Sequence, residues 1–225
     1  MKYEIQAAPL PVVTCTLAQG ETIVTESGGM SWMSDGISMD TSMGGGLGKG
    51  LGRVLGGESL FITRYTSQRE GTYIAFSSSF PGDIMVYDVS QGPLIVQKGS
   101  WLAAQESLEM KIHFKQKLGA GLFGGEGFIM QRLSGSGIVF LEIDGATIRK
   151  ELAPGEVLKV DTGYVAAYTE GMGFDIEVIK GVKNVLFGGE GMFNTVLTGP
   201  GTVYLQTMPI LNVARAIAPF VVTGK

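Results

Sequence analysis

The sequence has very little of the residue types that most metal and nucleophilic sites use. Cys15 is the only cysteine and His113 the only histidine among 225 residues. One cysteine excludes an intramolecular disulfide and a thiolate metal cluster, and one histidine cannot supply a cupin-like metal centre. Serine nucleophiles usually need a histidine base; a serine–lysine pair stays open, although no spacing supports it. We therefore expect no metal, no cofactor and no enzymatic activity.

Charge is also scarce. Charged residues make up 17% of the chain, against about 25% in a typical soluble domain. The net charge of −4 argues against a nucleic-acid partner, because such a surface normally shows a basic stripe. With so few charges to cover the outside, we expect part of the surface to be hidden against other copies of the chain.

Long apolar runs are missing as well. No stretch approaches the roughly 18 consecutive apolar residues of a membrane-spanning helix. The first residues, Met1 to Gln6, include an acid and lack the apolar region of a signal peptide. We expect a soluble cytoplasmic protein.

Glycine is abundant instead, with 35 residues against 8 prolines and no collagen period. This is about twice the usual glycine content. The glycines separate short apolar runs, which is the pattern of many strands joined by tight turns.

Three parts of the chain repeat one another. The block Leu-Phe-Gly-Gly-Glu-Gly at 122–127 recurs at 186–191, and Val-Leu-Gly-Gly-Glu-Ser stands at 54–59. A second shared piece follows each block, and we place the copies at approximately 15–85, 86–148 and 149–208 of a single domain spanning 1–225. The first copy is longer by three residues within the glycine tract 44–52, which predicts an enlarged loop.

Apolar residues alternate with polar ones inside the copies. In 108–115, Leu108, Met110, Ile112 and Phe114 alternate with Glu, Lys and His, and 174–178 repeats the pattern with Phe174, Ile176 and Val178. Such alternation predicts half-buried strands and puts His113 on a wet face. Only a short piece near Asn212–Ile217 favours a helix. We predict an all-β fold of sandwich or barrel type, with three equivalent units forming a pseudo-threefold body.

Several ordered motifs resemble those of a known family. They are the three Gly-Gly-Glu blocks, the turn at 81–83 (Pro-Gly-Asp), the run 134–141 and the closing run 199–207. Together they resemble the mitochondrial-biogenesis family, also known by the altered inheritance of mitochondria phenotype, over roughly Thr14 to Thr207. The resemblance implies repeats similar to the subunit of the tryptophan RNA-binding attenuation protein, a double-stranded β-helix-like sandwich, and it implies a homotrimer.

The resemblance transfers no catalytic residue, because the family has no settled activity. A fungal relative sits at the mitochondrial inner membrane, whereas we expect this chain to lack a transit peptide and a membrane anchor. It therefore resembles a prokaryotic cytoplasmic member that contacts a membrane at most peripherally. RNA binding follows only from analogy of fold.

The glycine tract 44–52 is the first candidate for a contact site. It fails as a phosphate-binding P-loop, because Met43 stands in place of the first glycine and Gly50 in place of Ser or Thr. A glycine-rich loop carrying exposed apolar residues is suited to a membrane or another subunit. The residues that we assign to this contact loop are Met43, Leu47, Lys49, Leu51 and Arg53.

Two other groups receive a structural interpretation. Glu58, Glu126 and Glu190 occupy equivalent places in the three copies, so each is expected to accept backbone N–H bonds in a glycine turn; a cation held where they meet is the alternative. A methionine-rich group near Trp32 is expected to pack or to form an adaptable surface, with thioether copper binding as the alternative. Its methionines are Met30, Met33, Met39 and Met43.

These observations favour a non-enzymatic homotrimeric scaffold, or an envelope-associated factor, that contacts a membrane or envelope protein through the loop of the first copy. The alternative is a protein that binds a small ligand in clefts between β repeats or between subunits.

Overall fold

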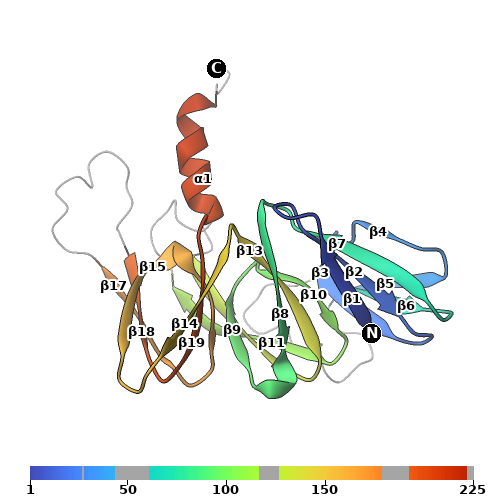
Figure 1. The fold of residues 1–225 in the computed structure, drawn as a ribbon, viewed down its shortest axis with the longest axis horizontal. Helices are drawn as coiled ribbons and strands as arrows, with labels where there is room; N and C mark the ends of the chain where they lie inside the picture. Colours follow the sequence, from blue (N-terminus) through green and yellow to red (C-terminus); the bar gives the residue numbers. More distant parts are fainter. Residues whose placement is uncertain (27, 44–60, 117–126, 179–192, 222–225) are drawn as a thin grey trace.

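The computed structural model describes residues 1–26, 28–43, 61–116, 127–178 and 193–221, most of which belong to antiparallel strands in four sheets (Figure 1). This confirms the predicted all-β class. Sheet A has the order β1 (Lys2–Gln6), β2 (Val12–Leu17), β7 (Thr72–Ser77), β4 (Trp32–Met33). Sheet B has the order β5 (Ile37–Met43), β6 (Phe61–Ser67), β3 (Thr22–Glu26), β10 (Trp101–Gln105), β13 (Ile138–Asp144), β8 (Gly82–Asp88).

Sheet C has the order β11 (Leu108–Gln116), β12 (Phe128–Gly135), β9 (Leu94–Gln97), β16 (Val165–Thr169), β19 (Gly201–Gln206), β14 (Thr147–Leu152). Sheet D has the order β15 (Val157–Asp161), β18 (Phe193–Thr198), β17 (Gly173–Val178). The helical segments are η1 (Val89–Gln91), η3 (Thr162–Tyr164), α1 (Ile210–Ile217) and η4 (Ala218–Phe220).

Strand pairing follows one pattern in three successive runs of six strands. We call these runs strand units: unit 1 is β2–β7, unit 2 is β8–β13 and unit 3 is β14–β19. In each unit the first strand pairs with the sixth, the second with the fifth, the third with the sixth and the fourth with the fifth. Each unit is thereby divided between two half-sheets of three strands. The pseudo-threefold body and the likeness to the attenuation-protein subunit stay predictions.

Half-sheets of neighbouring units join to form the six-stranded sheets. The second strand of unit 1, β3, pairs with the third strand of unit 2, β10, and β9 of unit 2 pairs with β16 of unit 3 in the same way. We call these two pairings the joints. The four sheets follow one another along the molecule, from sheet A at the blue end of Figure 1 to sheet D at the orange end.

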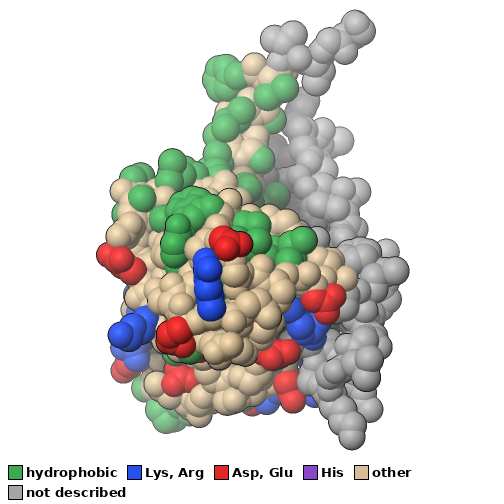
Figure 2. Space-filling model, turned by 90° about the vertical axis from the view of Figure 1, so that its right-hand side faces the viewer, with side chains coloured by type: hydrophobic (Ala, Val, Ile, Leu, Met, Phe, Trp, Pro, Cys, Tyr) green, Lys and Arg blue, Asp and Glu red, His purple; other side chains and the backbone are tan. Residues whose placement is uncertain are grey.

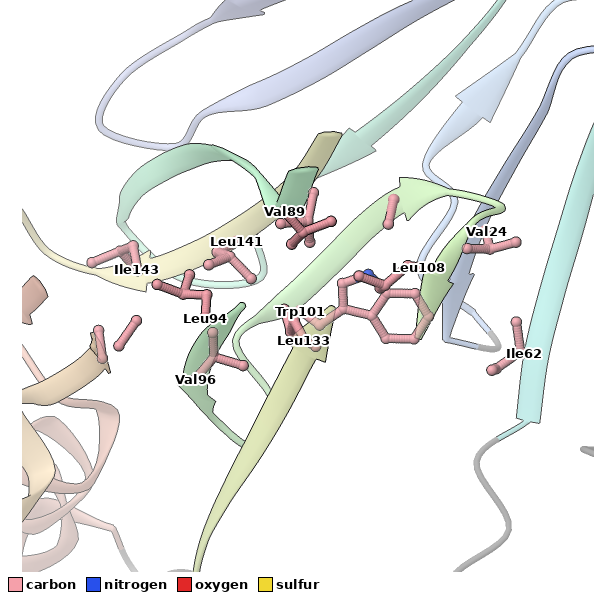
Figure 3. Close-up of a cluster of buried hydrophobic side chains, with 14 residues drawn as sticks. Val24, Ile62, Val89, Leu94, Val96, Trp101, Leu108, Leu133, Leu141 and Ile143 are labelled. Carbon is pink, nitrogen blue, oxygen red and sulfur yellow. The ribbon is translucent and has the colours of Figure 1, made fainter. Parts of the chain in front are cut away.

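Three hydrophobic cores lie between successive sheets. Cys15 and Phe76 of sheet A pack with Phe140 of sheet B, and Phe128 and Tyr168 of sheet C belong to the core shared with sheet D. Between sheets B and C, Trp101 lies among Leu94, Val96, Leu108 and Leu133 (Figure 3). Burying each large apolar side chain contributes roughly 1.5–3 kcal/mol, so these layers hold the sheets in place. 

The local sequence pattern is confirmed in β11 and α1. On β11, Leu108 is buried and Met110, Ile112 and Phe114 are half-buried, while the intervening residues, including His113, are exposed. The predicted helix is present and begins two residues earlier, at Ile210. In β17 the prediction is wrong at one position: Val178 is exposed, because it is the last residue of a strand at the edge of sheet D.

Candidate functional site

The joints between strand units bring buried apolar residues into register. At the first joint Val24 of β3 lies opposite Ala104 of β10, and at the second Ile95 of β9 lies opposite Tyr168 of β16. The side chains of Val24, Ala104 and Ile95 are fully buried. The two joints are therefore built in the same register, with the same strand positions in contact.

An arginine and a glutamate form an ion pair across each joint. Arg64 Nε of unit 1 lies 3.5 Å from Glu106 Oε1 of unit 2. Arg132 of unit 2 donates from Nε to Glu170 Oε1 at 2.5 Å and from Nη2 to Oε2 at 3.1 Å. The hydrogen bond from Arg132 lowers the pKa of the Glu170 carboxyl, so this pair is ionised at neutral pH.

Sequence reasoning did not identify these pairs, because the arginines and acids look scattered along the chain. One signal was available. The same number of residues separates Arg64 from Arg132 as separates Glu58 from Glu126, so the arginines occupy equivalent places in two repeats.

Sheets A and D each contain, at one edge, the counterpart of one of the two strands that form a joint. The counterparts of β4 are β10 and β16, and those of β15 are β3 and β9, which all pair across a joint. Within the described part of the chain, β4 and β15 have no strand on the corresponding edge. They lie near opposite ends of the molecule (Figure 1).

The exposed residues on these two strands occupy places that are buried at the joints. Met33 in β4 is the counterpart of Ala103 in β10, so Trp32 corresponds to Leu102. Trp32 is nevertheless 49% exposed, whereas Leu102 is 7% exposed. On β15, Lys159 is exposed, whereas its counterparts are the buried Val24 and Ile95. Residue positions that are buried at the internal joints are therefore exposed on β4 and β15, at the two ends of the molecule.

The positive charge of the joint is present in β15 in an altered form. Val24 and Ile95 lie opposite arginines, Arg64 and Arg132. In unit 3 the two residue types are exchanged between the strands, so that Lys159 lies opposite Val196. Its Nζ contacts Glu177 Oε2 at 2.7 Å. The third unit thus keeps one cation in this cross-strand pair, but on β15 instead of on β18.

An acid also lies close to the end of β4. Asp35 lies in the turn after β4, as Glu106 and Glu170 lie in the turns after β10 and β16. The Asp35 carboxylate is 94% exposed and lies 3.3 Å from Arg69 Nη2. An ion pair this exposed contributes little to stability, so the Asp35 carboxylate is accessible to another cation.

A small polar hollow lies where units 2 and 3 meet. It has a volume of about 160 Å³ and lies between the β9–β10 turn, β13, β19 and the start of α1. Glu142 accepts hydrogen bonds from Ser79 N at 3.1 Å and Ser79 Oγ at 2.5 Å. Burial raises the pKa of Asp144, which accepts a hydrogen bond from Ile210 N. The other polar side chains that line the hollow are Gln97, Lys98, Ser100 and Gln206.

Most residues predicted from sequence as sites lie outside the described part of the chain. Met43 is the last residue of β5, opposite Phe61. The other loop residues and the three repeat glutamates are not among the described residues: Leu47, Lys49, Leu51, Arg53, Glu58, Glu126 and Glu190. Their assigned roles stay predictions.

The methionine-rich group near Trp32 is divided by the fold. Met30 and Met33 pack against the core between sheets A and B, while Met39 is exposed on β5. Across the described ranges, no group of three or more His, Cys, Asp or Glu side chains is placed to hold a metal ion. Within those ranges, no helix is long and apolar enough to cross a bilayer.

One family model matches most of the chain, and two similar proteins come from Streptococcus pyogenes. The family model described as mitochondrial biogenesis AIM24 matches residues 3–208. An uncharacterized protein of Streptococcus pyogenes serotype M6 is 27% identical over 234 residues, covering 100% of this chain and 92% of that protein. A crystal structure of a Streptococcus pyogenes protein superposes with a TM-score of 0.77 at 24% identity, covering 98% of this chain and 99% of that one. The last similarity concerns the fold alone.

Proposed function

Because the chain belongs to the mitochondrial biogenesis AIM24 family, we propose that it is a non-enzymatic homotrimeric scaffold in which β15 of each chain pairs with β4 of the next. The proposal includes peripheral contact with a membrane or an envelope protein, in a prokaryotic cytoplasm. The observation that carries it is that, among the described residues, β4 and β15 have no neighbouring strand on the edge that their counterparts use for the internal joints.

The internal joints give the register of the proposed contact. Val24 lies opposite Ala104 and Ile95 opposite Tyr168, and Lys159 and Ser34 hold the corresponding places at the two ends. Lys159 of one chain would then lie opposite Ser34 of the next, beside the exposed Asp35. This adds a lysine–aspartate pair to a joint that also covers Trp32.

A head-to-tail contact of this kind must either close into a ring or continue as a fibre. The family resemblance implies closure with three chains. Closure leaves none of the β4 and β15 edges uncovered, and uncovered edges of this kind invite aggregation. The low charge content of the chain is consistent with surface that is covered in an assembly.

The test is a cross-link that depends on the register. In a Cys15→Ala background, Ser34→Cys combined with Lys159→Cys places two thiols opposite each other, within reach of a short bismaleimide because opposed Cβ atoms lie about 4.5–5.5 Å apart. We expect a covalent species of three chains, and light scattering of the untreated protein should give three times the mass of one chain. The matched control replaces Lys159→Cys by Lys111→Cys, an exposed lysine on β11. A monomeric mass, or equal cross-linking in the control, would exclude the proposed joint.

A second candidate function is the binding of a small polar solute. The polar hollow between units 2 and 3 favours it, since Lys98, Glu142 and Asp144 present charges of both signs there. Native mass spectrometry of the purified protein tests this function through a retained small molecule. The variant Glu142→Gln should then reduce the retained fraction.

A further inference from the structure

The C-terminal segment leaves the body of the molecule as a projecting helix (Figure 1). Its base is fixed by three contacts. Ile210 N donates to Asp144 Oδ2 at 2.8 Å, Asn212 Nδ2 donates to Tyr164 Oη at 3.0 Å, and Leu211 packs against the core between sheets C and D. Beyond this base, α1 and η4 extend away from the sheets.

The exposed side of α1 is its apolar side. Ile210, Val213, Ala214 and Ile217 follow the i, i+3, i+4, i+7 spacing that gathers side chains on one helix face. Ile210 and Ile217 are each 53% exposed, while the polar Asn212 is turned to the body. A surface helix of a soluble protein normally turns such a stripe toward the core, whereas in α1 Leu211 packs against the core and this stripe is exposed at both of its ends.

The apolar exposure increases toward the tip. Phe220 is 82% exposed and Val221 is 58% exposed, both beyond the end of α1. Figure 2 shows hydrophobic side chains along this projecting part. A tip with this composition is expected to leave water for an apolar surrounding.

The charge of the segment indicates what kind of apolar surrounding it favours. From residue 207 to residue 225 the sequence contains two basic residues, Arg215 and Lys225, and no Asp or Glu. All 21 acids of the chain therefore precede this segment. Apolar side chains combined with cations suit an anionic lipid surface, where basic residues are attracted and the apolar face enters the headgroup boundary.

We infer that the segment from Ile210 to Val221 docks on an anionic lipid bilayer through the stripe Ile210, Val213, Ala214 and Ile217 and the tip at Phe220. The inference rests on the membrane contact included in the proposed function and gives that contact a surface. A second copy of the chain fits this face less well. α1 follows β19, which is paired on both sides within sheet C, so the helix does not follow either strand of the proposed joint.

The test compares two isoleucine-to-glutamate variants in a vesicle flotation assay. Ile217→Glu places a carboxylate in the exposed stripe, and the matched control Ile148→Glu makes the same change on β14, where Ile148 is 44% exposed. Phe220→Glu serves as a second variant, since this side chain is the most exposed of the large hydrophobic residues described. Vesicles consist of phosphatidylcholine alone or with about one third phosphatidylglycerol.

We expect the wild-type chain and Ile148→Glu to float with the anionic vesicles and much less with phosphatidylcholine alone. Ile217→Glu and Phe220→Glu should reduce binding about tenfold or more, and raising the salt concentration to about 1 M should weaken the binding of the wild type. Light scattering should give one mass for all four proteins.

Three outcomes would overturn the inference. If the wild type floats and the Ile217→Glu and Phe220→Glu variants float equally well, the membrane contact lies elsewhere, for instance in 44–52, and the proposed function stands. If the wild type binds neither vesicle, the membrane contact of the proposed function fails as well. If Ile217→Glu lowers the oligomeric mass, the stripe is an interface between copies rather than a lipid-binding surface.

Discussion

The carboxylate of Asp144, at the end of β13, accepts a hydrogen bond of 2.8 Å from the backbone amide of Ile210, the first residue of α1. The two residues belong to elements 66 positions apart in sequence, and both line the polar hollow between units 2 and 3. The first amides of a helix have no partner within the helix. Asp144 therefore caps the N-terminus of α1, although it belongs to another element and not to the helix itself.

Replacing this carboxylate should loosen the base of the helix. We expect Asp144→Ala to lower the free energy of unfolding by about 1 kcal/mol, the usual cost of losing a cap. Amides in the first turn of α1 should also exchange faster with deuterium. Urea denaturation and hydrogen exchange measure the two effects. Asp144→Asn is the matched variant, because its side-chain oxygen can still accept the bond; equal losses in both variants would show that the cap is unimportant.

The local features of this fold could be predicted from sequence because each depends on neighbouring residues. The alternation from Leu108 to Lys115 reflects one wet and one packed face of a single strand. The helix near Asn212 depends on the spacing of apolar residues within two turns. Its orientation was not predictable, since it depends on Asp144 and Tyr164.

The joints could not be predicted for a similar reason. Pairing of β3 with β10 connects residues as distant as Val24 and Ala104, and both strands also pair within their own units. The repeat indicates that units are alike, but not which of their edges meet. The ion pairs Arg64–Glu106 and Arg132–Glu170 follow from that choice of edges, which is why the charges looked scattered.

Gly135, the last residue of β12, and Gly171, in the turn after β16, should respond differently to alanine. Gly135 and Gly171 both have a positive φ, of 109° and 92°. A Cβ at Gly135 would overlap the Ser107 carbonyl oxygen, whereas a Cβ at Gly171 would meet nothing within 4 Å. We expect Gly171→Ala to cost about 1 kcal/mol from backbone strain alone. Gly135→Ala should cost about 2–4 kcal/mol, because the hairpin must also shift.

Denaturation curves for the two variants test the difference directly. Equal losses of unfolding free energy would mean that the backbone around Ser107 can shift without an energetic cost.

The ion pair at the second joint should couple two units weakly but measurably. Arg132 contacts Glu170 through two hydrogen bonds, and both side chains are partly exposed. A double-mutant cycle with Arg132→Ala and Glu170→Ala should give a coupling of about 0.5–1 kcal/mol at low salt. Arg132→Lys should keep only part of it, because lysine cannot make the paired contact.

The same pair has a defined pH dependence. The pKa of Glu170 is lowered in the folded state by Arg132, so the unfolded chain binds a proton more readily. The contribution is present above the ordinary glutamate pKa of about 4.3 and is lost as pH falls through the lower folded value. A coupling that persists unchanged at pH 2 would contradict the assignment.

Cys15 gives the protein an alkaline sensitivity that one substitution should remove. Its side chain is fully buried in the core between sheets A and B, and burial raises the pKa of the thiol to about 12. In the unfolded chain the thiol ionises near pH 8.5, so above that pH the unfolded state releases a proton that the folded state keeps. Stability is therefore lost as pH rises from about 8.5 toward 12, by at most about 1.4 kcal/mol per pH unit.

Cys15→Ala should be less stable than the wild type at pH 7, because it leaves a small cavity. The difference between the two proteins should shrink steadily between pH 8.5 and 10, since alanine has no proton to release. Urea denaturation under reducing conditions at several pH values measures this difference, and the tyrosines, which titrate in both proteins, cancel in it. Two pH profiles that run parallel would mean that the thiol is ionisable in the folded protein, and hence that the core around Cys15 opens to water.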